Sequence, residues 1–309
     1  MPLLDVFLLL ALASIWGSSF IFMRYLSPIL GPVTTTGMRV LLAGLFLLAV
    51  FAATGFRLEW RKNWKRFLVV GVLNSGIPFF LYSFAALYIP ASLSVILNSL
   101  APLFGAVFSA AFRLERLTYR KAGGLVLGIA GVTLVSSFGP VSRSPWALAG
   151  VAACVLATVC YGLAGVYIRI RTLEVKPRAM AGGSQLMAGV LFIPLILASP
   201  PHAVPSLQVG AITILFAVLC SAVAFLLYFR LVADVGATRA LTVTLLMPAF
   251  GMLWGRLFLG ERITWTMVLG ALVILAGTFL VVFPPRRIRP APEADSPLPG
   301  PAVPGPGPR

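Results

Sequence analysis

Apolar runs of about 20 residues recur from one end of the 309-residue chain to the other, and each can cross a bilayer as a helix. Inside lipid, every backbone N–H and C=O group must find its partner within the protein, which leaves helices and closed barrels as spanning structures. The chain is also 60% hydrophobic and 10% charged, with a mean hydropathy of +1.00, well outside the range of soluble domains. We therefore predict an all-α integral membrane protein with ten transmembrane helices, over residues 3–24, 33–54, 67–88, 93–112, 119–138, 147–168, 178–199, 206–231, 239–259 and 265–283.

The two ends of the chain differ in character. Residues 1–24 contain Asp5 and lack the basic start of a secretory signal, so we expect a retained first helix. Residues 284–309 hold ten of the 24 prolines, a composition that cannot bury a core, and we predict a disordered cytoplasmic tail there. Cys154, Cys160 and Cys220 all fall in apolar runs, so no disulfide framework is implied.

The net charge of +16 is distributed unevenly among the loops. With the N-terminus placed in the cytoplasm, nineteen of the 24 Lys and Arg residues fall in the inward loops and the tail. By the positive-inside rule, both termini are then cytoplasmic. Nucleic-acid binding would need a basic groove with aromatic platforms in a folded domain, and the sequence offers no such domain. We therefore expect a lipid bilayer, and no nucleic acid, around this chain.

The second half of the chain repeats the first, at an offset of 145 residues near the start of each copy and 146 further on. Each copy contains five predicted helices, an odd number, so the second copy must enter the membrane from the opposite side. We predict two inverted five-helix repeats, residues 1–142 and 143–283. Secondary transporters often use this plan, because two similar halves that exchange conformations open one site to alternate faces. The matches include Trp16, Gly17 and Arg24 with Tyr161, Gly162 and Arg169; Pro102, Phe104 and Gly105 with Pro248, Phe250 and Gly251; and Glu115, Arg116 and Thr118 with Glu261, Arg262 and Thr264.

These residues resemble those of the EamA family of the drug/metabolite transporter superfamily. The resemblance covers residues 3–283 and rests on "ASIWGSSFIFMR" in the first predicted helix, Arg39 in the second, and the paired P-x-F-G and E-R-x-T series that begin at Pro102 and Pro248. It implies a ten-helix bundle with a central cavity lined mainly by helices 1, 3, 4, 6, 8 and 9. It also implies export of amino acids, other metabolites or cationic drugs from bacteria. The second copy departs from the family pattern at Tyr161, in place of Trp, and at Ser184, in place of Arg.

Small polar and aromatic side chains within the apolar runs are the candidate substrate-binding residues. A helix that faces lipid has no need of hydroxyl or amide groups, whereas a helix that lines a wet cavity does. The alternative is close helix packing or interhelical hydrogen bonding, which we favour for Gly17 and Ser18 and weigh equally for the asparagines. Proline inside a helix removes a backbone hydrogen bond, so we predict kinks or hinges at Pro78, Pro102 and Pro248. The candidate substrate-binding residues are Trp16, Ser19, Asn74, Tyr82, Asn98, Thr158, Tyr161, Tyr228 and Thr244.

Charged residues within or beside the apolar runs are interpreted as structural. Arg39 lies near the start of its predicted helix, so it can reach outward toward water or bond carbonyl groups and fix the packing. Glu115 and Glu261 lie at equivalent helix ends and are each followed by Arg, which favours boundary ion pairs or caps. All eight acidic residues fall in loops, tails or helix ends, so we predict an uncoupled or weakly coupled carrier. A single His and the lack of a P-loop predict neither a metal nor another cofactor.

The predicted cavity combines aromatic rings with amide and hydroxyl groups and no fixed charge. Zwitterionic amino acids, aromatic ones included, suit it, and so do organic cations, which are attracted to ring faces. We predict a bacterial inner-membrane transporter that exports such small solutes by alternating access, as a monomer or a homodimer. The alternatives are a membrane-embedded enzyme acting on lipid, for which no nucleophile with a partner is visible, and an ion channel.

Overall fold

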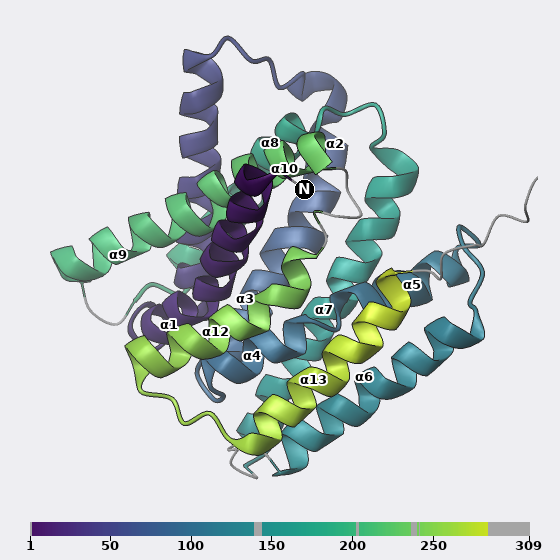
Figure 1. The fold of residues 1–309 in the computed structure, drawn as a ribbon. Helices are drawn as coiled ribbons and strands as arrows, with labels where there is room; N and C mark the ends of the chain where they lie inside the picture. The colour runs from purple at the N-terminus through teal and green to yellow at the C-terminus, as the bar shows by residue number, and fades with distance from the viewer. Residues whose placement is uncertain (1, 139–143, 202–203, 236–239, 241, 284–309) are drawn as a thin grey trace, which may run out of the picture.

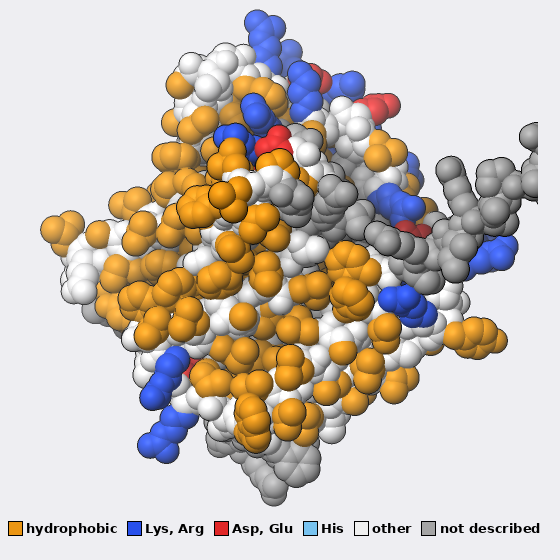
Figure 2. Space-filling model, viewed as in Figure 1, with side chains coloured by type: hydrophobic (Ala, Val, Ile, Leu, Met, Phe, Trp, Pro, Cys, Tyr) orange, Lys and Arg blue, Asp and Glu red, His pale blue; other side chains and the backbone are white. Residues whose placement is uncertain are grey.

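Helices form the regular structure of this protein in its computed structural model, which describes residues 2–138, 144–201, 204–235, 240 and 242–283. No strand occurs among these residues, and seven of their helices are long and apolar enough to cross a membrane. Side chains in the middle of helices, such as Leu45, Ile129 and Leu272, are exposed, and wide apolar surfaces of this kind mark contact with a membrane or another protein. Figure 2 shows hydrophobic side chains covering the middle of the visible face, with most of the visible Lys and Arg side chains above or to the right of them. The expectation of an all-α membrane protein is confirmed.

The helices of the first half are α1 (Leu3–Ala53), α2 (Trp60–Gly71), α3 (Ile77–Ala85), α4 (Ala91–Asn98), α5 (Ala101–Ala111) and α6 (Tyr119–Phe138). The helices of the second half are α7 (Pro145–Arg171), α8 (Pro177–Ala198), α9 (Leu207–Ala217), α10 (Ala224–Val235), α12 (Val243–Leu259) and α13 (Trp265–Val282). Two π-helical turns, η1 (Val72–Gly76) and η2 (Val218–Val223), join α2 to α3 and α9 to α10. The predicted tail, residues 284–309, lies outside the described residues.

Several helices begin where a hydroxyl side chain can accept an unpaired backbone N–H. Ser144, Ser206 and Thr264 precede α7, α9 and α13, and their side chains accept hydrogen bonds from Ala147 N, Val209 N and Met267 N. Such N-caps satisfy donors that the first helical turn leaves without a partner. They fix where these three apolar helices begin.

Gly31 divides α1 into two arms. Its φ of 77° and ψ of 155° are non-helical, and a positive φ of this kind suits glycine because it has no Cβ. The chain reverses direction at this residue, so the second arm runs back from the first (Figure 1). The prediction of a connection over residues 25–32 is therefore wrong in its extent, because the first arm stays helical up to Leu30.

Two further predicted spans have different boundaries in the structure. The span predicted over residues 67–88 begins earlier, at Trp60, so Arg61, Lys62, Lys65 and Arg66 lie on helix α2 rather than in a loop. The span predicted over residues 93–112 is divided between α4 and α5 by a turn at Ser99 and Leu100. Length and apolarity located both segments, but the polar first turn of α2 and the break after Asn98 carry no hydrophobic signal.

The helices of the two halves pack against each other. The helix α13 contacts α6, α1 contacts both α8 and α12, and α5 contacts α7. Figure 1 shows α13 and α6 side by side at the lower right. A methyl group added at Gly124 would lie 2.6 Å from the carbonyl oxygen of Gly277, and one added at Gly131 would lie 3.0 Å from that of Gly270. The α6 and α13 backbones therefore approach closely, which suits membrane helices because lipid provides no hydrophobic drive for their association.

We expect Gly124→Ala to lower the free energy of unfolding by about 1–3 kcal/mol, because the added methyl group must push α6 and α13 apart. Gly123→Ala is the matched control, since a methyl group there meets no atom within 4 Å. Alanine at residue 123 should leave stability unchanged or raise it by up to about 1 kcal/mol through helix propensity. Thermal unfolding of the purified proteins in detergent compares the two variants, and an equal loss in both would contradict the close contact.

Candidate functional site

Arg39 is buried, with 4% of its surface exposed, and does not reach outward toward water. Its Nε donates a hydrogen bond to Ser221 Oγ at 3.0 Å, and its Nη2 donates to Ser19 Oγ at 3.4 Å. A weaker contact of 3.8 Å joins Nη1 to the Met23 sulfur. The guanidinium carbon also lies 3.7 Å from the centroid of the Phe79 ring and 4.6 Å from that of Phe216. We call this group the arginine cluster: Ser19, Met23, Arg39, Phe79, Phe216 and Ser221.

Four segments of the fold bring the arginine cluster together. Both arms of α1 contribute, with Ser19 and Met23 on the first and Arg39 on the second. Phe79 comes from α3, Phe216 from α9, and Ser221 from the π-helical turn η2. A π-helical turn inserts an extra residue into a helix and often occurs at functional sites. Here it places a hydroxyl acceptor beside the guanidinium.

Tyr82, Asn98 and Tyr161 form a second group with Phe20, the tyrosine cluster. The Tyr82 hydroxyl donates to Asn98 Oδ1 at 2.9 Å, and both side chains are buried. The Tyr82 ring stacks on that of Tyr161 with 6.3 Å between centroids and meets the Phe20 ring edge-on at 5.2 Å. Tyr161 also packs against the core group that contains Phe79, so the tyrosine cluster adjoins the arginine cluster. Three of the predicted substrate-binding residues are thus brought together.

Trp16 and Tyr228 meet in a third group, the tryptophan cluster, which also contains Phe225. The Trp16 ring lies 5.4 Å from the Tyr228 ring and 6.2 Å from the Phe225 ring, measured between centroids. Trp16 packs against two separate core groups, as Tyr161 does, yet both side chains stay half-buried. The repeat matches Trp16 with Tyr161 and Tyr228 with Tyr82. The ring pair Trp16–Tyr228 is therefore equivalent in the repeat to the ring pair Tyr161–Tyr82.

Three of the predicted substrate-binding residues lie outside these three clusters. Asn74 is half-buried on the π-helical turn η1, and Thr244 is half-buried on α12. Thr158 is fully buried, and its hydroxyl donates to the carbonyl oxygen of Val155 one turn earlier in α7. That bond satisfies Thr158 within its own helix, the arrangement typical of a packing residue.

The three prolines predicted as kinks have different settings. Pro78 lies in the first turn of α3, directly after η1, and Pro102 lies in the first turn of α5, after the break that ends α4. A first turn tolerates proline because its N–H groups have no helical partner. Pro248 lies inside α12, whose helix runs on through it.

Glu115 forms ion pairs in the connection between α5 and α6, although not with the adjacent Arg116. Its Oε2 accepts a hydrogen bond from Lys121 Nζ at 2.7 Å, and its Oε1 accepts one from Arg169 Nη1 at 2.5 Å. The hydrogen bond from Lys121, followed by that from Arg169, lowers the pKa of the Glu115 carboxyl below 4.5. The carboxylate thus ties the α5–α6 connection to the end of α7.

Glu261, the residue equivalent to Glu115, has a different partner. It accepts hydrogen bonds from the backbone N–H groups of Ala91 and Ser92 at 2.6 and 2.9 Å and from Ser92 Oγ at 2.5 Å. A carboxylate here satisfies the free N–H groups of α4 and interacts favourably with its helix dipole. Arg24, which is equivalent to Arg169, donates instead to the carbonyl oxygen of Ala86. The two equivalent helix ends are therefore in different arrangements.

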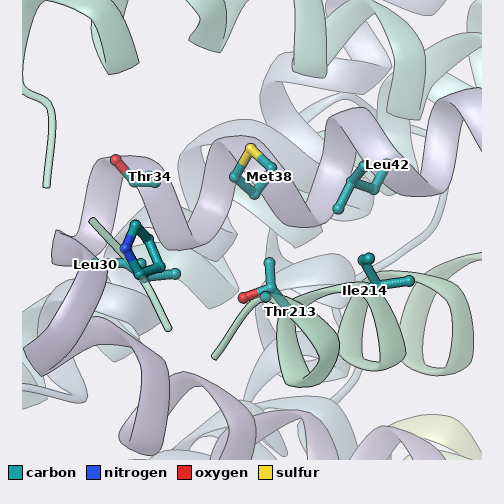
Figure 3. Close-up of a pocket in the computed structure, with 8 residues that line it drawn as sticks. Leu30, Thr34, Met38, Leu42, Thr213 and Ile214 are labelled. Atoms are coloured by element: carbon teal, nitrogen blue, oxygen red, sulfur yellow. The ribbon is translucent and has the colours of Figure 1, made fainter. Parts of the chain in front are cut away.

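A pocket of about 310 Å³ lies between the second arm of α1 and α9 (Figure 3). None of the predicted substrate-binding residues lines it. In Figure 3 the side chains of Met38 and Leu42 project from one helix and those of Thr213 and Ile214 from the other. Six of the nine predicted residues instead meet as packed side chains in the three clusters. The wall of the pocket is formed by Leu30, Thr34, Met38, Leu42, Pro205, Gly210, Thr213 and Ile214.

The sequence interpretation missed most of the surroundings of Arg39. Phe79 and Ser221 had an available signal, because each recurs in the other half, as Phe225 and Ser75. Met23 and Phe216 had none, since an apolar side chain in an apolar helix is indistinguishable by pattern from one facing lipid. Among the residues that the structure describes, no group of His, Cys, Asp or Glu could hold a metal ion.

Comparison with known proteins gives matches along nearly the whole chain. The EamA-like transporter family model matches twice, at residues 3–137 and at residues 148–283. An uncharacterized transporter of Archaeoglobus fulgidus is 24% identical over 86% of this chain and 94% of its own length. The uncharacterized transporter YvbV of Bacillus subtilis is 28% identical over 89% of this chain and 90% of its own. The uncharacterized inner membrane transporter YedA of Escherichia coli is 26% identical over 91% and 92%. A solved crystal structure with 18% identity shares the fold, with a TM-score of 0.64 over 89% of this chain and 95% of that one.

The pH dependence of stability tests the Glu115 ion pairs. Because they lower the pKa of the folded state, their stabilisation is present above about pH 4.5 and is lost as the pH falls below that value. We expect Glu115→Gln to lower the unfolding temperature at pH 6 and to bring it level with that of the parent protein near pH 3. Glu174→Gln is the control, since Glu174 is exposed and lies 3.8 Å from Arg66 in a single ion pair. A pH profile of Glu115→Gln parallel to that of the parent would contradict the assignment.

Proposed function

The chain belongs to the EamA-like transporter family, and on this basis we propose that it is a secondary transporter that exports small organic solutes, amino acids among them, by alternating access. The inner membrane of a bacterium is the proposed location, because the Escherichia coli relative YedA is named an inner membrane transporter. The observation that carries the proposal is the two-fold family match, one copy in each half of the chain. Duplicated halves suit a protein that must present one site to two sides of a membrane.

We infer further that the two copies are inverted and supply ten crossings. As one unbroken helix, the 51 residues of α1 would span about 77 Å at about 1.5 Å per residue, too long for one crossing of a roughly 30 Å core. Gly31 instead divides them into two arms, each of which can supply one crossing. The contacts between α6 and α13 are reciprocal, since Gly124 meets Gly277 and Gly131 meets Gly270. In the repeat, residue 124 is equivalent to residue 270, and residue 131 is equivalent to residue 277. Residue numbers thus rise along one helix as they fall along its equivalent, which supports an antiparallel relation.

Helix contacts between the halves support the same arrangement. A methyl group at Gly17 would meet Phe250 and Gly251 of α12, and one at Gly162 would meet Phe104 and Gly105 of α5. These four positions in α12 and α5 are equivalent in the repeat, as are the two glycines. The π-helical turns η1 and η2 also fall at equivalent positions. Each half therefore uses the same contacts to hold its first helix against the other half.

The clusters supply the proposed transport path. The ring pairs Trp16–Tyr228 and Tyr161–Tyr82 are equivalent in the repeat, and Trp16 and Tyr161 stay half-buried between separate core groups. Such side chains can contact a solute when the core groups separate. We propose Trp16, Ser19, Tyr82, Asn98, Tyr161 and Tyr228 as residues along this path, together with Asn74 and Thr244, and leave Thr158 as a packing residue.

The unequal helix ends suggest how the path opens. Glu261 binds the first turn of α4, whereas Glu115 is engaged by Lys121 and Arg169. Two equivalent residues in one structure thus adopt two arrangements, and an exchange of these arrangements between the ends would close one side as it opens the other. The hold of Glu261 on α4 is the proposed lock on its side.

Counterflow in proteoliposomes tests transport. We expect saturable exchange of labelled phenylalanine, threonine or another amino acid of a mixed panel, unchanged by a pH gradient. Glu261→Gln weakens the hold on α4 and should lower the exchange rate several-fold, whereas Glu174→Gln, an exposed control, should not. The absence of any solute movement would favour the lipid-acting enzyme, and an ohmic current without saturation would favour the channel.

Cysteine labelling tests the inverted arrangement. Replacing Cys154, Cys160 and Cys220 by Ala gives a background into which Trp60→Cys and Val204→Cys are introduced separately; both positions are exposed. We expect a membrane-impermeant thiol reagent to reach residue 204 in intact cells and residue 60 only after lysis. Labelling of both from the same side would contradict inversion and a cytoplasmic N-terminus together.

A further inference from the structure

Arg39 lacks a negatively charged partner within the described part of the chain. Its hydrogen-bond acceptors are two serine hydroxyls and a thioether, and its guanidinium carbon lies over two phenyl rings. The six acidic residues of the described part lie at helix ends or in connections, and their ion pairs are made with other cations. The buried Arg39 guanidinium is therefore in contact with neutral groups only.

Burial of an unpaired charge is costly, and the neighbours of Arg39 offset only part of that cost. Aromatic faces attract a cation, and hydroxyl groups accept its protons, but neither supplies a counter-charge. Guanidinium carries five N–H donors in a planar fork that matches a carboxylate. In Arg39, the Nε, Nη1 and Nη2 atoms each donate one hydrogen bond to a weak or neutral acceptor. An anionic ligand would complete the set with charge-assisted hydrogen bonds.

The arginine cluster adjoins the aromatic path. Ser19, which accepts from Arg39, is followed by Phe20 of the tyrosine cluster, and Phe79 lies one turn before Tyr82 on α3. Tyr161 packs against the core group of Phe79 and stacks on Tyr82. A small solute that places a carboxylate at Arg39 can therefore reach the aromatic rings with its apolar part.

The charge is present in one half only. The residue equivalent to Arg39 is Ser184, which is also buried and whose hydroxyl donates to the carbonyl oxygen of Ala181 in its own helix. The path thus carries a single positive centre, whereas the carboxylates of the described part, including the buried Asp5 in the first turn of α1, lie at helix ends or in connections. This differs from the uncharged cavity expected from the sequence, in which organic cations fitted as well as amino acids.

We propose that Arg39 binds the carboxylate of the transported solute, so that the protein moves small carboxylates with an apolar or aromatic group and rejects organic cations. The proposal rests on the proposed transport function and makes Arg39 a binding residue rather than a purely structural charge. Phe79 and Phe216 contact the guanidinium group, and Ser19 and Ser221 are the acceptors that a carboxylate would replace or supplement.

Binding is tested first with three probes that share a phenyl ring and differ in charge: phenyllactate, phenylalanine and phenyltrimethylammonium. We expect millimolar phenyllactate or phenylalanine to raise the unfolding temperature of the full-length protein in detergent, and phenyltrimethylammonium to leave it unchanged. Stabilisation by the cation alone, or equal stabilisation by all three, would overturn the proposal. This measurement needs no substituted protein.

Counterflow of the same probes is then compared among variants. Arg39→Gln should reduce carboxylate exchange at least tenfold, and Arg39→Lys should retain part of it because the charge remains. Ser184→Ala is the matched control at the equivalent buried position and should exchange carboxylates like the parent protein. Size-exclusion and thermal-unfolding profiles show whether Arg39→Gln folds; if it does not, the binding measurement decides.

The outcomes separate this proposal from transport itself. Carboxylate binding that depends on Arg39, without counterflow of any probe, supports the binding site and contradicts the proposed transport function. Counterflow of phenyltrimethylammonium but not of the carboxylates supports a transporter and overturns the role of Arg39. Undiminished carboxylate exchange by a folded Arg39→Gln protein likewise overturns it.

Discussion

Lipid can neither bond to backbone polar groups nor drive apolar helices together, and every feature of this fold responds to that constraint. The chain satisfies its backbone hydrogen bonds by remaining helical across nearly all of its apolar length. Its helices associate through close backbone contacts, such as that between α6 and α13 at Gly124 and Gly277. Where the helix is broken, at Ser99 and Leu100, both residues are buried in protein, and Thr278 Oγ1 donates to the freed carbonyl oxygen of Ser99 at 2.8 Å.

The same irregular segments carry the polar groups of the candidate site. Ser221 lies in the π-helical turn η2 and Asn98 at the last residue of α4. A regular helix pairs its backbone internally, so it offers few polar contacts to a solute or to a buried charge. Local breaks relax that pairing and change the direction of side chains. The break after Asn98 and the Ser221 segment of η2 thus lie where neighbouring helices cover them.

The sequence supports the fold class, the position of most helices and the duplication, because hydrophobic length and internal similarity are strong signals. It could not locate Gly31 as the single non-helical residue between two long arms, since glycines elsewhere in these helices stay helical. It identified Arg39 as costly but not its partners, because the cluster joins residues as distant in the chain as Ser19 and Ser221. The different arrangements of Glu115 and Glu261 were equally hidden, since their flanking sequences are alike.

A duplicated scaffold and an asymmetric charge have separate physical consequences. Motion between two arrangements needs the halves to be similar, so that each end can adopt the contacts of the other at little change in free energy. Recognition of a solute needs no such equality, because the solute itself lacks two-fold symmetry. Ser184 occupies the position equivalent to Arg39, and the glycine contacts and aromatic ring pairs of the two halves are nevertheless equivalent. Charge selectivity can therefore change through one buried side chain while the helix packing that governs movement is preserved.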